Sequence, residues 1–296
     1  MEAIFLGTGA MVATKDRNQL GVFIQHSGFG FLVDCGEATQ RQFRIAGKSL
    51  HKIDRILLSH LHGDHCLGLP GILQTLSATD YEKTLYIYGP IGTKKFVDGI
   101  LSTFIFDNVI KLKICEIESG KVFDNETLKV FGFPLNHKMP CLAYRFIEKD
   151  KRRVNMKNAK ALGLKAGPVL GKLQRGNSVE VKGKKILPDD VTYIVKGKVL
   201  SLIFDTSLNE NCIKVATDSD VLICEATYEA KDEEKAREYF HLTSAQAATI
   251  ASQANVKKLY LAHFSQRYKT LEQLEKDAKD IFPETYIAHD FLKIKL

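Results

Sequence analysis

The stretch His60-Leu61-His62-Gly63-Asp64-His65-Cys66-Leu67 carries three imidazoles and one carboxylate within six positions. It follows an apolar run at residues 53–58, Ile-Asp-Arg-Ile-Leu-Leu, which predicts a buried strand that ends at the rim of a sheet. Imidazole nitrogens and carboxylate oxygens are the donors that zinc and similar divalent ions take in proteins. The stretch therefore predicts a metal site at the end of a strand, in preference to a histidine-rich surface loop.

The spacing within this stretch divides its donors into two pairs. His60 and His62 lie two residues apart, so their side chains point to the same side of an extended chain. Asp64 and His65 follow the turn that Gly63 permits, and they can face a second ion. The alternative is a single metal site accompanied by side chains that bind no metal. Two ions need further ligands from elsewhere in the chain.

The composition is that of an ordinary globular protein of 296 residues, with 45% hydrophobic and 26% charged residues. No apolar run reaches the roughly 18 residues of a membrane span, so no membrane partner is expected. The six cysteines lie singly along the chain, without a Cys-x-x-Cys pair. This usage favours reduced thiols and predicts a cytoplasmic protein.

The excess positive charge is concentrated in one segment. Residues 149–175 contain nine lysines and arginines and a single acid, Asp150, a net charge of +8, whereas the whole chain carries +7. Neutralisation of phosphates by such a segment supplies most of the non-specific affinity for nucleic acid. The segment therefore predicts a polyanionic partner. The alternative is a solvated, charged surface hairpin.

Apolar runs and helical patterns alternate along the chain, which predicts an α/β fold with sheets flanked by helices. The runs that predict strands occupy residues 3–7, 20–25, 29–35, 53–59, 84–89, 109–115, 127–133, 191–195, 199–205, 220–224 and 257–262. Helical periodicity appears at 37–46, 66–78, 93–102, 209–216, 243–254 and 271–281, and Thr243 with Gln246 forms a capping-box signature.

Residues 149–190 break this rhythm. Four glycines and one proline within 163–176 argue against regular structure there. A long insertion in a compact domain is usually functional or disordered. We therefore predict one domain over residues 1–296, with residues 149–190 as an inserted flexible arm that protrudes from it.

Three further polar residues end strongly apolar runs. His137 follows residues 130–136, Asp205 follows 201–204, and His263 follows 259–262. One such residue alone is more often a hydrogen-bonded side chain at a sheet rim. Its repetition indicates that the sheets bring all three residues to the rim that carries the first cluster.

The motif His-x-His-x-Asp-His at 60–65, followed in order by His137, Asp205 and His263, resembles the metallo-β-lactamase superfamily. The flanking sequence resembles most closely the short form of the tRNA 3′-processing endoribonucleases, the ribonuclease Z family. The matching blocks are 5–10, 34–37, 59–65, 68–71, 224–227, 241–243 and 263–268, and they cover nearly the whole chain. The first motif identifies only the superfamily. The blocks Glu-Ala-Thr, His-Leu-Thr and His-x-Ser-x-Arg-Tyr are far more specific.

The resemblance implies an αββα sandwich, in which two packed mixed β-sheets are flanked by helices. It implies a zinc-dependent endoribonuclease that removes the 3′ trailer of precursor tRNA, leaving a tRNA 3′-hydroxyl and a 5′-phosphate on the trailer. It also implies two zinc ions per subunit, with manganese or magnesium as possible substitutes, and a homodimer.

The resemblance further implies roles for individual residues. One metal takes His60, His62 and His137, the other takes Asp64, His65 and His263, and Asp205 bridges the two. Asp64 orients or deprotonates the attacking water, His241 is the general acid, and Glu225 orients a catalytic histidine. Ser265 and Arg267 are expected to hold a phosphate. Within the arm, the tRNA contacts are expected at Gly167, Pro168, Lys172, Arg152 and Arg153.

One departure from the family concerns the residue before the bridging carboxylate. Phe204 stands where glycine is common, and its ring can crowd the backbone beside Asp205. We expect a local adjustment there, with the metal site retained.

Two other functions stay open on the sequence. The chain could be a hydrolase of small phosphodiesters or esters, for which the basic arm would have no use. It could also be a non-catalytic RNA-binding protein with a structural metal, although seven ligands exceed the four that a structural zinc needs.

Overall fold

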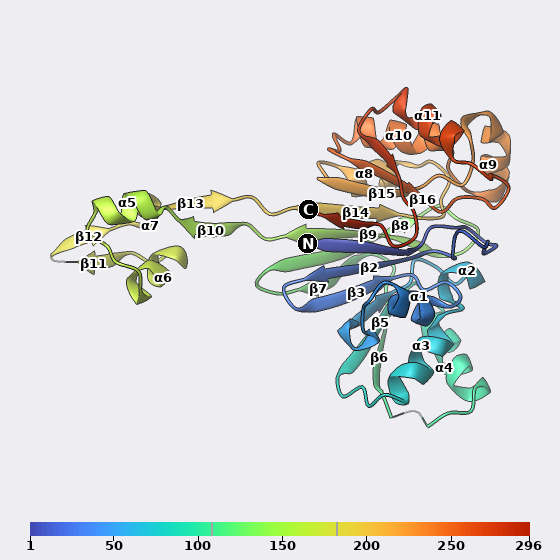
Figure 1. The fold of residues 1–296 in the computed structure, drawn as a ribbon, viewed down its shortest axis with the longest axis horizontal. Coiled ribbons are helices and arrows are strands. Elements are labelled where there is room, and N and C mark those ends of the chain that lie inside the picture. Colours follow the sequence, from blue (N-terminus) through green and yellow to red (C-terminus); the bar gives the residue numbers. More distant parts are fainter. Residues whose placement is uncertain (108, 182) are drawn as a thin grey trace. The chain divides into compact units, whose positions relative to one another are not determined.

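The computed structural model describes residues 1–107, 109–181 and 183–296. The chain forms two compact units, one of residues 1–147 with 199–296 and one of residues 148–198, and each is described here by itself. Figure 1 labels the elements of both. Within the described residues, no helix is both long enough and apolar enough to cross a membrane.

The larger unit contains two seven-stranded mixed sheets. The first has the order β18 (Lys293–Lys295), β1 (Glu2–Gly7), β2 (Gly21–His26), β3 (Phe29–Val33), β4 (Arg55–Leu57), β5 (Thr84–Gly89), β6 (Lys111–Glu116). The second has the order β17 (Thr285–Ile287), β16 (Leu259–Ala262), β15 (Val221–Glu225), β14 (Val199–Ile203), β9 (Cys141–Glu148), β8 (Leu128–Leu135), β7 (Gly120–Asp124). Strands β3 to β6 pair in parallel, and so do β14 to β17.

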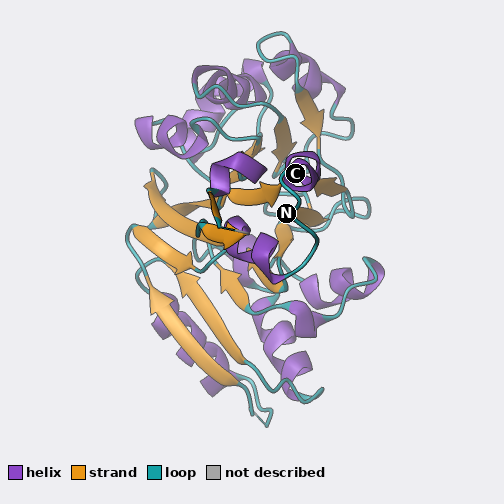
Figure 2. Ribbon diagram, turned by 90° about the vertical axis from the view of Figure 1, so that its left-hand side faces the viewer, coloured by secondary structure: helices purple, strands orange, loops and turns teal. Residues whose placement is uncertain are grey.

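Helices cover the outer face of each sheet (Figure 1). The first sheet carries α1 (Thr39–Ile45), α3 (Leu69–Ser77) and α4 (Thr93–Thr103). The second carries α8 (Glu210–Ala216), α10 (Ser244–Gln253) and α11 (Glu272–Lys279). Figure 2 shows the same layering after a quarter turn, with helices outside the strands. The predicted αββα sandwich is confirmed.

Successive side chains of a strand point to opposite faces of the sheet, and this alternation explains the layering. In β1, Phe5 belongs to the core between the sheets, whereas Ile4 packs among side chains of the helix-covered face. In β15, Ile223 lies between the sheets and Leu222 faces the helices of the second sheet. Strands β1 and β15 are therefore buried on both faces, which is why they read as nearly continuous apolar runs.

Phe146 of β9 lies in the core between the sheets. It is fully buried, and its ring meets that of Phe31 edge to face, with centroids 5.4 Å apart. Replacing Phe146 by alanine is expected to lower the free energy of unfolding by about 3–5 kcal/mol, because the cavity cannot collapse completely. Urea unfolding followed by circular dichroism measures this. The matched control is Ile105→Ala, whose side chain is fully exposed, and an equal loss in both variants would contradict this packing.

The smaller unit has its own strands, helices and apolar cluster. Strand β10 (Lys151–Val154) pairs with β13 (Thr192–Val195), and β11 (Val179–Val181) pairs with β12 (Lys184–Ile186). Helices α5 (Met156–Ala161), α6 (Pro168–Gln174) and α7 (Pro188–Val191) accompany them. The buried apolar residues of the unit are Ala159, Leu164, Leu170, Leu173, Ile186 and Val191.

The expectation of irregular chain across 163–176 is wrong, because α6 lies within it. Pro168 stands in the first turn of this helix, where proline is favourable. Gly163 and Gly176 follow the ends of α5 and α6 with φ of 72° and 87°, a conformation that suits glycine at helix ends. The glycines thus mark helix boundaries. The flexibility of the arm stays a prediction, and Lys182, within the predicted range 149–190, lies outside the described residues.

Candidate metal centre

The predicted metal ligands lie beyond the ends of four strands of the larger unit, either in the loop that follows the strand or in a short helix. The first cluster follows β4, and its second half forms the short helix α2 (Gly63–Cys66). His137 follows β8, Asp205 follows β14 and His263 follows β16. The side chains converge although they are up to 203 positions apart in the chain. The structure thus brings all seven residues together as the sequence predicts.

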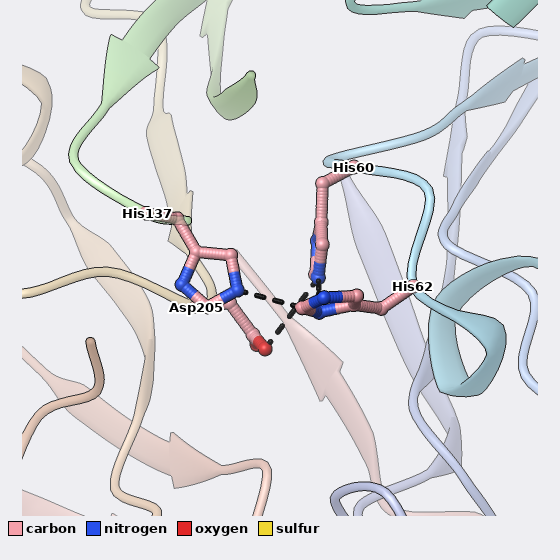
Figure 3. Close-up of side chains that lie close together, drawn as sticks. All are labelled: His60, His62, His137 and Asp205. Atoms are coloured by element: carbon pink, nitrogen blue, oxygen red, sulfur yellow. Dashed lines mark hydrogen bonds and ion pairs between the residues drawn. The ribbon is translucent and has the colours of Figure 1, made fainter. Parts of the chain in front are cut away.

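The first group of donors consists of His60, His62, His137 and Asp205, whose ligand atoms all lie within 4.8 Å of one another. His60 Nε2 is 2.9 Å from His62 Nδ1, and His137 Nε2 is 3.3 Å from the same nitrogen. Figure 3 shows the three rings and the carboxylate pointing toward a common centre. Three imidazoles and a carboxylate form a donor set that suits a tetrahedral zinc ion.

The second group consists of Asp64, His65 and His263. The Nε2 atoms of His65 and His263 are 3.2 Å apart, and Asp64 Oδ2 lies 3.4 Å from each. Asp205 reaches this group through Oδ1, which is 3.3 Å from His65 Nε2, whereas its Oδ2 is 3.6 Å from His60 Nε2 in the first group. A carboxylate with one oxygen toward each group is placed to bridge two ions.

The residues present fit divalent cations. The neutral ring of His137 can donate from Nδ1 to the Phe240 carbonyl, which leaves a lone pair on the Nε2 that faces His62. Asp205 Oδ1 is buried and accepts no hydrogen bond from any residue that the structure describes. A cation between these donors would satisfy both features, and the donor types are those that zinc, manganese or iron take.

The second nitrogen of each buried imidazole is held by a fixed partner. Asp34 Oδ2 is 2.8 Å from His65 Nδ1, and the carboxylate of Asp34 also accepts from the amide and hydroxyl of Ser59. Such contacts fix the tautomer and the ring orientation of a metal ligand. The remaining anchors are Ser59 Oγ to His60 Nδ1 at 3.0 Å, the Phe240 carbonyl to His137 Nδ1 at 3.1 Å, and Thr227 Oγ1 to His263 Nδ1 at 2.9 Å.

The carboxylates of the cluster and two of its imidazoles are held in the protonation states of metal ligands. Burial alone would raise the pKa of Asp64, but the imidazoles of His65 and His263 outweigh it and hold this pKa well below its ordinary range. The pKa of Asp205 is lowered in the same way. Burial holds the pKa of His60 and of His137 below the ordinary value, so these rings are neutral at pH 7. Ionised carboxylates and neutral imidazoles are the forms that bind metal. Burial alone would lower the pKa of His65, but Asp205, Asp34 and Asp64 outweigh it and raise this pKa, so His65 loses a proton when it binds metal.

Three residues of the site have a left-handed backbone, which is rare outside glycine. The φ angles are 55° at Asp34, 21° at Asp205 and 58° at His263. Such strain concentrates at functional sites, where the surrounding structure holds it in place. Phe204 is buried in the core between the sheets, so the chain turns sharply after it and Asp205 absorbs the adjustment that the sequence leads us to expect.

His241 and Glu225 form a pair beside the cluster. The two oxygens of Glu225 lie 3.3 and 3.2 Å from His241 Nδ1, and they also accept from the Thr206 amide and the Thr227 hydroxyl. Burial alone would lower the pKa of His241, but Glu225 and Asp205 outweigh it and raise this pKa to about 9. The ring is therefore suited to donate a proton.

The position of His241 also allows a second interpretation. Its ring centroid is 5.6 Å from that of His137 and 5.6 Å from that of His263. Together with Asp205 and His263 it forms another possible group of metal donors. General acid and metal ligand are thus both compatible with the geometry, and metal analysis of a variant can separate them.

A cleft of about 490 Å³ opens onto the cluster. Ser265 and Arg267 line it as predicted, and Arg267 Nε donates to Ser265 Oγ over 3.2 Å. The guanidinium lies over the ring of Tyr228, 4.9 Å from its centroid, and no carboxylate of the described residues pairs with it. Sequence reasoning does not find Lys138 and Tyr239, which also line this cleft.

The predicted tRNA contacts of the arm belong to the smaller unit. Gly167, Pro168, Lys172 and Arg153 are exposed, whereas Arg152 is half-buried and forms an ion pair with Asp189. The structure leaves four of the five residues open to a partner. Their binding role stays a prediction.

Comparison with known proteins identifies the family. The ribonuclease Z of Methanothermobacter thermautotrophicus is 40% identical over all of this chain and 97% of that protein. The ribonuclease Z of Bacillus cereus strain AH187 is 40% identical over 98% of this chain and 97% of that protein. The chain belongs to the ribonuclease Z family.

Solved structures agree with this assignment. The short form of human tRNase Z is 27% identical to this ribonuclease Z family member, with a TM-score of 0.75 over 100% of this chain and 99% of the human one. The metallo-β-lactamase fold protein YhfI from Bacillus subtilis shares the fold, with a TM-score of 0.72 at 18% identity over 99% and 98% of the two chains. A family model described as Anti-Pycsar protein Apyc1 matches residues 1–96.

Proposed function

We propose that this ribonuclease Z family member is a metal-dependent endoribonuclease that removes the 3′ trailer from precursor tRNA. Cleavage leaves a 3′-hydroxyl on the tRNA and a 5′-phosphate on the trailer. The observation that carries the proposal is the pair of ligand groups joined by Asp205 in a chain of this family. Paired metal sites stabilise both the entering and the leaving oxygen of an in-line displacement at phosphorus.

The cations, when bound, act as Lewis acids on the phosphate and lower the pKa of water, so that a nucleophile is available at neutral pH. Asp64 lines the cleft and stays ionised, so its carboxylate is suited to accept a hydrogen bond from that water and to orient it. Asp205 and the buried imidazoles would hold the ions at the floor of the cleft, where these side chains themselves are largely shielded from solvent. A fixed, partly dry arrangement of charges is what accelerates such a reaction.

His241 is the proposed general acid for the departing 3′-oxygen of the tRNA. Glu225 holds its Nδ1, which leaves Nε2 as the nitrogen that can donate into the cleft. Glu225 keeps the ring charged and oriented without itself reaching the substrate. This division of roles is common where a carboxylate supports a catalytic histidine.

We propose zinc as the metal, with two ions per subunit and with manganese or magnesium as substitutes. The nitrogen-rich donor sets favour zinc over magnesium, which prefers oxygen ligands. Elemental analysis of the purified protein by mass spectrometry measures both identity and number. One ion per chain would contradict the bridging role of Asp205.

Removing the metal is expected to lower stability as well as activity. An ion at about 1,000 times its dissociation constant adds roughly 4 kcal/mol to the free energy of unfolding. At about 2–4 °C per kcal/mol, dialysis against EDTA should lower the melting temperature by on the order of 10 °C. Calorimetry with and without added zinc measures this, and an unchanged melting temperature would contradict a bound metal.

The basic arm is the proposed binding surface for the body of the tRNA. Its ends lie side by side, because Lys196 and Asp150 form an ion pair at 2.8 Å. Residues 151–195 can therefore be replaced by a Gly-Gly turn. We expect affinity for precursor tRNA to fall on the order of 100-fold at 50 mM salt, and its salt dependence to become shallower.

Filter binding over a salt series measures both effects. Hydrolysis of bis(p-nitrophenyl) phosphate should suffer far less, because that substrate is too small to need an arm. Unchanged tRNA affinity after the replacement would contradict the proposal that the arm binds tRNA.

Two further proposals concern assembly and compartment. We propose a homodimer, as the resemblance to the short forms implies, and sedimentation equilibrium tests it. We propose the cytoplasm as the compartment, because all six cysteines are free thiols and five are buried. Fractionation of the source cells tests the second proposal.

The deciding experiment is cleavage of an end-labelled precursor tRNA with zinc or manganese, with the cut mapped at nucleotide resolution. A single cut after the acceptor stem, with a 3′-hydroxyl on the tRNA, is the expected result. Turnover of small phosphodiesters without cleavage of the precursor would favour the small-molecule hydrolase instead.

A further inference from the structure

Lys138 is a cation in the cleft that has no acidic partner among the described residues. It follows ligand His137 directly and lines the cleft, with its side chain exposed. The ammonium lies 5.1 Å from the ring centroid of Tyr239 and 5.9 Å from that of Phe240. Within the described part of the chain it has no carboxylate within 4 Å and no hydrogen-bond acceptor. Its charge is therefore available to an anion.

The backbone holds this lysine beside the first ligand group. Phe240 has a left-handed backbone, with φ of 61°, and its carbonyl lies 3.1 Å from His137 Nδ1. This contact joins the end of α9 (Glu233–Tyr239) to the loop after β8. The rings of Tyr239 and Phe240 are thereby placed against Lys138, and they restrict where its ammonium can go.

Arg267 is the counterpart of Lys138 at the second ligand group. It lies four residues after ligand His263 and is likewise held over an aromatic ring, that of Tyr228. The ring centroid of His241 is 5.6 Å from that of His137 and 5.6 Å from that of His263. The same cleft is thus lined by a cation that is close in sequence to a ligand of each group, and by the proposed acid.

We propose that Lys138 binds the RNA backbone phosphate on one side of the scissile phosphate, while Arg267 binds the phosphate on the other side. The proposal rests on the proposed function and names how the same cleft holds its substrate. A lysine ammonium is a strongly hydrated point charge that suits a phosphate oxygen. An aromatic ring beneath the ammonium does not neutralise its charge. The attraction between the two is weak, about 0.5–1 kcal/mol at exposed sites, so the ammonium can still bind a phosphate.

The first test measures binding of precursor tRNA in a cleavage-deficient His65→Ala background. Lys138→Met removes the charge and keeps the aliphatic stem, whereas Lys138→Arg keeps the charge. The matched control is Lys258→Met, because Lys258 is also an exposed lysine over a tyrosine ring, 6.0 Å from Tyr286, and does not line the cleft.

Lys138→Met should weaken binding on the order of tenfold at 50 mM salt and reduce the salt slope by about one. Lys138→Arg should restore most of the affinity, and Lys258→Met should match the parent. Equal behaviour of Lys138→Met and Lys258→Met would overturn the proposal and leave Lys138 as a surface side chain packed on Tyr239.

The second test locates the contact. Precursor RNAs carry a single neutral methylphosphonate either immediately upstream or immediately downstream of the scissile linkage. On one of them, Lys138→Met should cause less than a twofold loss of affinity, because the lost partner is already neutral. Arg267→Met should behave in this way on the other RNA.

The assignment would be overturned if Lys138→Met caused its full loss of affinity on both modified RNAs. It would also be overturned if Lys138→Met and Arg267→Met were both insensitive on the same modified RNA. Failure of the proposed function itself has a different signature. In that case the wild-type protein does not cleave precursor tRNA, and neither do the variants at position 138.

Discussion

His65→Ala is expected to abolish cleavage of precursor tRNA while the body of the protein stays folded. The imidazole is fully buried and links three carboxylates, with Nδ1 2.8 Å from Asp34 and Nε2 within 3.4 Å of Asp64 and Asp205. Without it the second ligand group loses one of its two nitrogen donors. A metal supplies several kcal/mol of transition-state stabilisation, and each 1.36 kcal/mol is tenfold in rate. We expect a loss of at least about 10³-fold.

The control for this variant is His289→Ala, an exposed histidine outside the cluster that should leave cleavage and metal content unchanged. Single-turnover cleavage, metal analysis and circular dichroism are measured together. The fold should survive, because Asp34 keeps its hydrogen bonds from Ser59 when the imidazole is gone. A folded His65→Ala protein that cleaves at the wild-type rate would contradict the metal-dependent mechanism.

The metal ligands are predictable from the sequence because each one follows an apolar run. Parallel strands of a sheet end at the same edge, so residues that follow them meet in space. This rule predicts that His137, Asp205 and His263 lie together, and the structure confirms that they converge. The sandwich follows from the same runs, since strands buried on both faces need helices outside them.

Strand β9 is absent from the predicted strands for a reason that lies in its charge. Residues 141–148 contain Arg145, a charged residue that interrupts the apolar pattern shortly before the basic segment. In the structure its guanidinium donates to the carbonyls of Val215 and Thr217. A half-buried cation that is satisfied by distant carbonyls leaves no trace in local sequence.

The contacts of Lys138 and Phe240 are likewise not predictable from the sequence. They depend on a left-handed backbone at Phe240, a residue type for which φ above zero is rare. By contrast, the predicted capping box of Thr243 and Gln246 is confirmed, with both of its hydrogen bonds present. Local capping rules therefore fix where α10 begins. The loop before it is shaped by His137, 103 residues away from Phe240.

Replacing His241 by alanine is expected to lower kcat on precursor tRNA by about 10²–10⁴-fold, the usual contribution of a general acid. The effect should fall on the chemical step, because the departing 3′-oxygen of a ribose is a poor leaving group without a proton. A phosphodiester whose leaving group is p-nitrophenolate departs without one. The same variant should therefore hydrolyse bis(p-nitrophenyl) phosphate with a much smaller loss.

Metal content separates this role from the alternative at the same position. If His241 serves as a proton donor, His241→Ala retains the metal content of the parent protein. If it serves as a ligand with Asp205 and His263, the variant binds less metal and loses both substrates equally. Glu225→Gln provides the matched comparison, because its amide oxygen can still accept from the Thr206 amide and its NH2 group can donate to the Thr227 hydroxyl, but it no longer presents a charge to the imidazole. Its loss should show the same dependence on the leaving group, since Glu225 acts on the reaction only through His241.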